Sequence, residues 1–84
     1  MNATMTAFLH VTEARPLGGF RVHLVFNNGD HGAVDLRPHL DGPVFEPLRD
    51  PALFRQFSIE GHTLCWPNGA DFAPEFLHGL LRPS

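Results

Sequence analysis

Six histidines are the first candidates for metal or acid–base chemistry in this 84-residue chain. They are His10, His23, His31, His39, His62 and His78. A structural zinc site needs convergent ligands, which short-spaced clusters along the chain usually supply. These histidines instead stand singly, and a cross-strand pair of His10 and His23 would supply only two ligands. The pattern favours scattered histidines on polar faces, so we expect no metal and no other cofactor.

The single cysteine, Cys65, is a candidate nucleophile with His62 or His23 as its base. A reactive cysteine needs partial exposure and a cation or helix N-terminus that stabilises the thiolate. Cys65 instead lies between Leu64 and Trp66 in a predicted strand, a position typical of a small buried apolar residue. On a strand, an offset of three also places His62 and Cys65 on opposite faces. We therefore expect no nucleophilic catalysis.

Four carboxylates, Asp35, Asp41, Asp71 and Glu75, are candidates for an acidic site. Asp71 and Glu75 have a simpler explanation, because negative charge near a helix N-terminus contributes about 0.3–1 kcal/mol. The chain contains no serine-centred elbow, phosphate loop or dinucleotide fingerprint. The sequence therefore predicts a protein that is not an enzyme.

The most informative segment joins the only tryptophan to a turn and then to a helix. The residues that define it are Trp66, Pro67, Asn68, Gly69, Asp71 and Pro74. Asn68-Gly69 accepts positive φ at low cost, so the chain reverses there. Pro74 suits the first helical position, because its φ is already near the helical value and an N–H would have no partner there. Trp66 is predicted to lie in the core with a partner for its indole N–H, and a half-exposed Trp66 on a binding surface is the alternative.

The last helix is expected over residues 74–81. With Pro74 first, Phe72 precedes the cap and Leu77 is the fourth helical residue, which is the spacing of a hydrophobic staple. An apolar face then follows at helical spacing. It consists of Phe76, Leu77, Leu80 and Leu81. We expect this face to pack on a sheet, and a fully buried Phe76 would cost about 3–5 kcal/mol on truncation to alanine.

Three strands are predicted in the first half of the chain. Residues 8–14 are rich in strand-forming types, and Pro16 with the glycines after it ends that run. Apolar residues then alternate over 20–26, which is typical of a strand with one buried face. Asn28-Gly29 joins this strand to residues 31–36 as an antiparallel hairpin.

Residues 37–51 contain four prolines and predict an ordered crossover with one short helical turn. Its expected apolar anchors are Val44, Phe45 and Leu48.

A short helix is expected after the crossover, capped by Asp50 and beginning at Pro51. Its apolar face would hold Leu53, Phe54 and Phe57, and it would end near Phe57. Residues 58–60 and 63–66 then predict a second hairpin. The whole chain, residues 1–84, is expected to form one α+β domain, a small antiparallel sheet of hairpins with two short helices packed on it.

Composition restricts the partners and the compartment. Six arginines and no lysine face nine acidic residues, for a formal net charge of −3, which disfavours nucleic acid as a partner of this chain alone. The N-terminus lacks the basic and apolar regions of a secretory signal, and no apolar run approaches the roughly 20 residues of a membrane span. The single cysteine permits no intrachain disulfide and fits a reducing compartment. We expect a cytoplasmic protein without a membrane partner.

The chain resembles a family of small bacterial proteins known as domain of unknown function 2442. The resemblance covers residues 11–81 and rests on three segments. These are the strand, turn and strand from Val22 to Leu36, the middle segment from Phe45 to Phe54, and the segment from Trp66 to Leu77. It implies a compact α+β domain with antiparallel strands. Some members resemble the N-terminal half of a longer protein with a helix-turn-helix domain, and others are encoded beside a second small protein in a toxin–antitoxin-like arrangement.

The leading functional hypothesis is a non-enzymatic module that binds a small protein or itself, with the antitoxin-like half of a two-gene pair as its specific form. The alternatives are a small-molecule-binding or metabolic accessory protein, and a transcriptional regulator domain that lacks its helix-turn-helix half. An edge strand presents unpaired N–H and C=O groups, and a proline-stiffened crossover lowers the cost of docking. The expected partner surfaces are therefore the first strand, represented by Val11, and the crossover, represented by Phe45 and Leu48.

Overall fold

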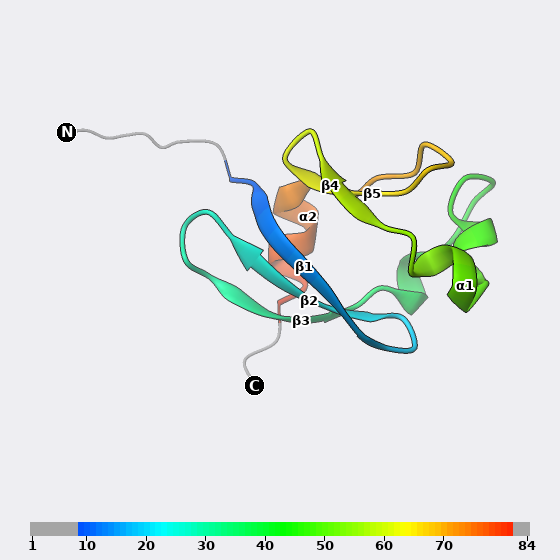
Figure 1. Ribbon diagram of the computed structural model, residues 1–84, viewed down its shortest axis with the longest axis horizontal. Helices are drawn as coiled ribbons and strands as arrows, with labels where there is room; N and C mark the ends of the chain where they lie inside the picture. The colour runs from blue at the N-terminus through cyan, green and yellow to red at the C-terminus, as the bar shows by residue number, and fades with distance from the viewer. Residues whose placement is uncertain (1–8, 82–84) are drawn as a thin grey trace.

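The protein, seen in a computed structural model that describes residues 9–81, has an α+β fold (Figure 1). A three-stranded antiparallel sheet has the order β1 (Val11–Gly18), β2 (Arg21–Phe26), β3 (His31–Asp35). A second antiparallel sheet pairs β4 (Ser58–Glu60) with β5 (Thr63–Cys65). Two short helices, α1 (Pro51–Phe54) and α2 (Pro74–Gly79), complete the fold. The predicted fold class is therefore confirmed.

The β2–β3 hairpin forms where the alternation of apolar residues predicted it. Val22, Leu24 and Phe26 are all buried and point to the core, as a strand with one buried face requires. At the turn, the Phe26 N–H donates to the Asp30 carbonyl oxygen at 2.8 Å, and Gly29 takes a φ of 90°. That positive φ is the reason for glycine at this position.

The first strand departs from its prediction. It was expected over residues 8–14, but β1 runs from Val11 to Gly18 and continues through Pro16. Residue 8 lies outside the described part of the chain. Pro16 is tolerated because β1 is an edge strand of its sheet, where a missing N–H breaks no ladder bond. The register shifts on both sides of the strand's middle, between Val11 and Glu13 and between Pro16 and Gly18.

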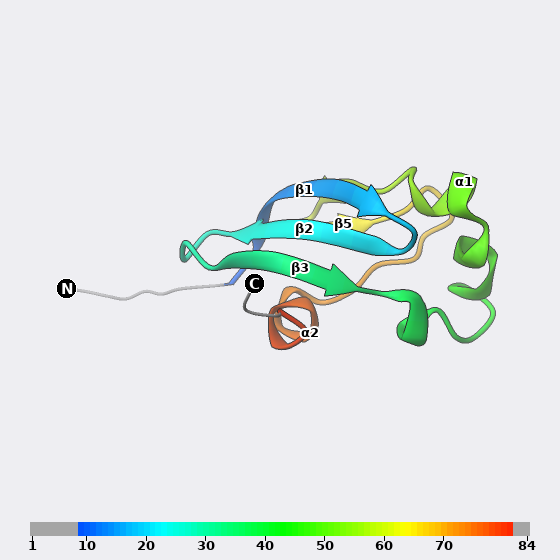
Figure 2. The same cartoon turned by 90° about the horizontal axis from the view of Figure 1, so that it is seen from below.

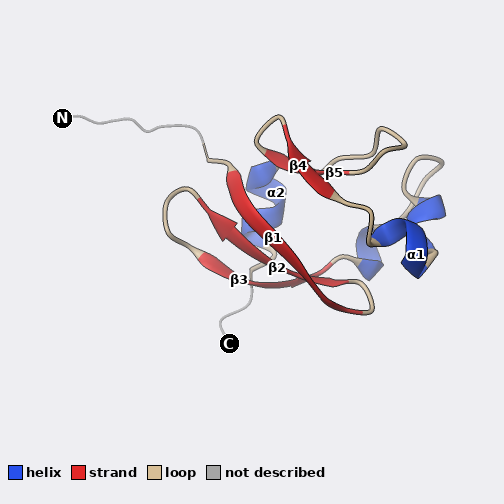
Figure 3. Cartoon of the chain, in the orientation of Figure 1, coloured by secondary structure: helices blue, strands red, loops and turns tan. Residues whose placement is uncertain are grey.

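The crossover contains two 3₁₀ turns rather than one, η2 (Arg37–His39) and η3 (Glu46–Arg49). Leu48 is a buried anchor, and Phe45 is half-buried with its ring stacked on Phe72 at a centroid distance of 4.6 Å. Val44 does not anchor the crossover, because 46% of it is exposed. Figure 3 shows the crossover turns and α1 gathered at the end of the molecule away from the start of β1.

Helix α1 begins as predicted but is shorter. The Asp50 side chain accepts a hydrogen bond from the Ala52 N–H at 3.0 Å, and Pro51 opens the helix. The helix ends at Phe54 and so consists of a single turn, which buries only part of the predicted apolar face. Phe54 is buried, whereas Leu53 points outward with 40% exposed, which corrects the predicted shared face.

In Figure 2, α2 is drawn below β3, on the side of β3 away from β1. Its first residue is Pro74, as predicted, but it ends at Gly79 instead of residue 81. Leu77 is fully buried, whereas Phe76 is 41% exposed and so does not meet the condition of full burial. The rings of Phe76 and His39 pack edge to face, with their centroids 5.1 Å apart. Phe76 therefore lies beside the crossover.

Candidate functional site

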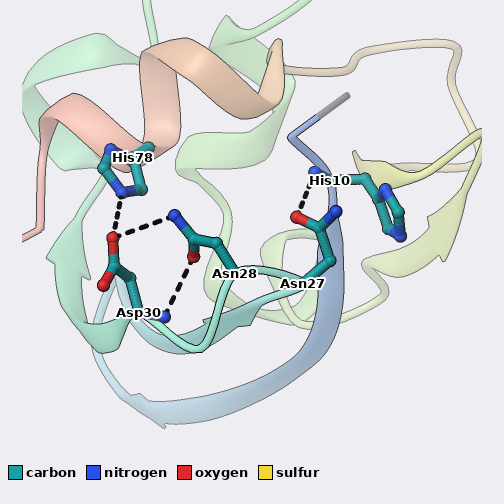
Figure 4. Close-up of polar contacts among 5 residues, drawn as sticks. All are labelled: His10, Asn27, Asn28, Asp30 and His78. Atoms are coloured by element: carbon teal, nitrogen blue, oxygen red, sulfur yellow. Dashed lines mark hydrogen bonds and ion pairs between the residues drawn. The ribbon is translucent and has the colours of Figure 1, made fainter. Parts of the chain in front are cut away.

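A polar network joins the β2–β3 turn to α2 and to the residue before β1 (Figure 4). His78 Nε2 lies 2.7 Å from Asp30 Oδ2, and the Asn28 amide donates to the same oxygen at 3.1 Å. On the other side of the turn, the His10 N–H donates to Asn27 Oδ1 at 3.0 Å. The hydrogen bond from His78 is the main cause that holds the pKa of the Asp30 carboxyl below its ordinary value, against a smaller opposing effect of desolvation. These contacts fasten the turn to its neighbours.

The histidines pair differently from the expected arrangement. His23 lies opposite Arg15 in the β1–β2 register, whereas the His10 carbonyl accepts from the Asn27 N–H. The predicted cross-strand pair of His10 and His23 is therefore wrong. His10 instead packs against His62 at a ring distance of 4.9 Å, and His23 packs against His31 at 5.6 Å. Among residues 9–81, no three histidine, cysteine or acidic side chains gather where they could hold a metal ion.

Cys65 and the four candidate carboxylates do not gather into one cluster among residues 9–81. Cys65 is half-buried rather than fully buried, and its Sγ donates to the Ser58 carbonyl oxygen at 3.6 Å across the β4–β5 pair. Asp35 accepts from the Arg37 backbone N–H, whereas Asp41 pairs with Arg49. Asp71 forms an isolated bridge with Cys65. Cys65 and Asp71 are thus backbone neighbours, and Glu75 lies in the first turn of α2. The described structure does not bring the five groups into one site.

Trp66 is a core residue, as predicted. It is 4% exposed, and its indole Nε1–H donates to the Phe54 carbonyl oxygen at 2.7 Å. Its backbone N–H donates to the Ala70 carbonyl, which closes the Asn68-Gly69 turn. The Asn68 side chain fixes that turn in two directions, because Oδ1 accepts from the Ala70 N–H and Nδ2 donates to the Val44 carbonyl. The segment from Trp66 to Pro74 is thus tied to both α1 and the crossover.

An apolar pocket of about 170 Å³ opens where this segment meets η3 and α1. Its lining comes from all three elements: Pro47, Leu48, Leu53, Gln56, Trp66, Pro67 and Asn68. Sequence reasoning assigned Leu53 to the core and missed Pro47 and Gln56. Pro47, Trp66 and Pro67 are each visible in the sequence. Their meeting at one pocket depends on the path of the crossover, which no local pattern specifies.

The residues proposed as partner surfaces occupy different positions from those expected. Val11 and Leu48 are each 2% exposed and belong to the core, and Phe45 is half-buried. The Val11 N–H also donates to the His62 carbonyl oxygen at 2.9 Å, so the start of the β1 edge already has a neighbour. Of the three, only Leu48 lines the apolar pocket.

A comparison with known protein families gives a match over most of the chain. The model of the family described as "Protein of unknown function (DUF2442)" matches residues 11–83. The chain belongs to the DUF2442 family. No curated protein and no solved structure gives a significant match.

The DUF2442 match spans every strand and helix of the structure, from the start of β1 through the end of α2. It therefore includes both the Trp66 segment and the crossover that together form the apolar pocket. None of the helices among the described residues is long and apolar enough to cross a membrane.

Proposed function

We propose that this DUF2442 domain is a non-enzymatic protein–protein interaction module and that its apolar pocket receives a side chain of a small partner protein. The observation that carries the proposal is the pocket's size and lining. At about 170 Å³ it is smaller than the roughly 300–1,000 Å³ typical of small-molecule sites. A single apolar anchor from a protein partner fits such a pocket, because binding energy at protein interfaces concentrates in a few buried anchors.

The walls of the pocket are held in place before any partner arrives. Trp66 is fixed by its hydrogen bond to Phe54, and Asn68 is fixed to Val44 across 24 residues of chain. Pro47 and Pro67 restrict the backbone on two sides. A preformed site lowers the ordering cost of association, so a small contact can contribute useful affinity.

In its specific form, the proposal makes the domain the antitoxin-like half of a two-gene pair in the cytoplasm. The support is the family resemblance and the single, unpaired Cys65, which suits a reducing compartment. The partner is then the small protein encoded beside this chain.

The test compares Leu53→Asp with Leu17→Asp for binding to the purified product of the adjacent gene. Leu53 lines the pocket and is 40% exposed, whereas Leu17 is 43% exposed on β1 and does not line it. The two variants thus introduce the same charge at equally exposed leucines. Titration calorimetry should show at least about tenfold weaker binding for Leu53→Asp only, since a charge in a desolvated apolar anchor site is costly.

Circular dichroism of each variant checks that the fold is retained. Equal affinities for the two variants would show that the pocket is not the contact. A wild-type domain that binds no adjacent gene product and stays monomeric at high concentration would contradict the interaction module itself.

A further inference from the structure

A second hollow lies between the two crossover turns and shares no lining residue with the apolar pocket. Its volume is about 540 Å³, within the range of roughly 300–1,000 Å³ for small-molecule sites. The lining combines two cations, one anion and three apolar residues: Arg37, Arg49, Asp41, Phe20, Pro38 and Pro51. Two of the chain's six arginines therefore meet in one place.

Two hydrogen bonds orient Arg49 at this hollow. Its Nε–H donates to the Leu40 carbonyl oxygen at 2.9 Å, and Nη2 donates to Asp41 Oδ1 at 2.8 Å. These bonds connect η3 to the residues that follow η2, and both segments line the hollow. A guanidinium has five N–H donors, and these two bonds leave others for a ligand.

The guanidinium of Arg37 forms no ion pair with a carboxylate among residues 9–81. Its guanidinium carbon lies 5.9 Å from the centre of the Phe20 ring, and no ion pair in the described structure includes it. Phe20 is itself braced by an edge contact with the buried Phe54 at 5.2 Å. The ring therefore supports the guanidinium at the wall of the hollow.

The charges of the hollow do not cancel. Arg37 and Arg49 face Asp41 alone, so the lining carries one net positive charge in a chain whose formal net charge is −3. Planar guanidinium groups bind carboxylate and phosphate oxygens through paired N–H donors. Phe20 and the two prolines offer apolar walls to the rest of a ligand.

We propose that this hollow binds a small organic oxyanion, a carboxylate or a phosphate ester, through Arg37 and Arg49, with its apolar body against Phe20, Pro38 and Pro51. The Asp41 carboxylate competes with the ligand for Arg49, because it pairs with Arg49 Nη2 in the free protein. The proposal is independent of the protein partner, since it concerns a different set of residues.

The test is a calorimetric and NMR titration of the folded domain with benzoate, adenosine monophosphate and inorganic phosphate in low salt. Benzoate and adenosine monophosphate distinguish carboxylate from phosphate as the anion, and inorganic phosphate lacks the apolar body. At least one organic anion should bind more tightly than inorganic phosphate, and the affinity should fall as sodium chloride screens the charges.

Three variants give effects of different sign. Arg37→Gln should weaken binding by about fivefold, the scale of one exposed charge contact. Arg15→Gln is the matched control, because Arg15 is an exposed arginine of β1 that does not line the hollow. Asp41→Asn should tighten binding by about two- to fivefold, since it frees Arg49 from its carboxylate.

Four results would overturn the proposal. They are the absence of binding by both organic anions at millimolar concentration, equal affinities for Arg37→Gln and Arg15→Gln, weaker binding after Asp41→Asn, and no advantage of either organic anion over inorganic phosphate. Chemical shift changes confined to the hollow's residues would support it. Changes confined to residues that do not line the hollow would also contradict it.

Discussion

Neighbouring residues of α2 should respond very differently to truncation, although both belong to the apolar face predicted from the sequence. Leu77 is fully buried, so Leu77→Ala removes atoms from a closed core and should cost about 2.7–5 kcal/mol. Phe76 is 41% exposed. Only about three-fifths of the cost of a buried phenylalanine, about 3–5 kcal/mol, then applies, which gives about 2–3 kcal/mol.

The expected cost for Phe76→Ala is lower still, at about 2 kcal/mol, because water fills the space of a half-exposed ring and no closed cavity remains. What remains is mainly the loss of its contacts with two rings. Phe76 stacks on Phe72 at 5.4 Å and meets His39 at 5.1 Å, and such aromatic contacts contribute about 0.5–1.5 kcal/mol each.

Urea unfolding followed by the fluorescence of Trp66 measures both free energies of unfolding, with circular dichroism as a second probe of two-state behaviour. If Leu77→Ala is already unfolded without urea while Phe76→Ala is folded, the loss of stability is again larger for Leu77→Ala, as expected. Equal losses for the two variants at low protein concentration would refute the reasoning, because they would mean that the Phe76 ring is as buried in solution as Leu77.

Three further predictions concern the polar network, the tryptophan and the absence of metal or DNA binding. The pKa of Asp30 is lowered in the folded state, so its contact with His78 stabilises the fold at pH values above the ordinary carboxyl pKa of 3.8. This stabilisation is lost as the pH falls through the lower pKa of the folded state. Asp30→Asn should therefore reduce stability at pH 7 and make the melting temperature depend less on pH in the acid range. Trp66→Phe should cost at least about 2 kcal/mol in urea unfolding monitored by circular dichroism, because the buried Phe54 carbonyl loses its donor and the core loses volume; a loss below 0.5 kcal/mol would contradict this. At neutral pH the domain should bind neither zinc nor specific duplex DNA, and one-to-one submicromolar zinc binding in calorimetry, or sequence-dependent DNA retention at physiological salt, would overturn that expectation.

Local backbone chemistry predicted the starts and turns of this fold well. Asn28-Gly29 closes the β2–β3 hairpin, and Asp50 caps α1 through the Ala52 N–H. Each of these features depends on residues a few positions apart, so the sequence contains all the information needed. The same reasoning located Pro74 at the start of α2.

Predictions that depended on distant contacts were less accurate. Pro16 was expected to end the first strand, but whether proline fits a strand depends on whether that strand lies at an edge, and the edge is set by the order of the sheet. Leu53 and Phe76 were assigned to apolar faces of helices that proved to be only four and six residues long. In such short helices the buried side is chosen by docking against the rest of the core, so spacing alone misplaces residues at the margin of the face.

Both candidate binding sites adjoin the crossover between β3 and α1, and the reason is physical. A segment with so many prolines cannot complete a sheet or a long helix, so its path is fixed by anchors instead of a repeating ladder. Leu40 and Leu48 enter the core, while Arg49 and Asn68 bond to backbone carbonyls of the crossover. Anchors at separate points leave spaces between them that regular elements would have filled. The two hollows are such spaces, one lined by apolar side chains and one by arginines, and that difference in lining is why we assign a protein side chain to the first and an oxyanion to the second.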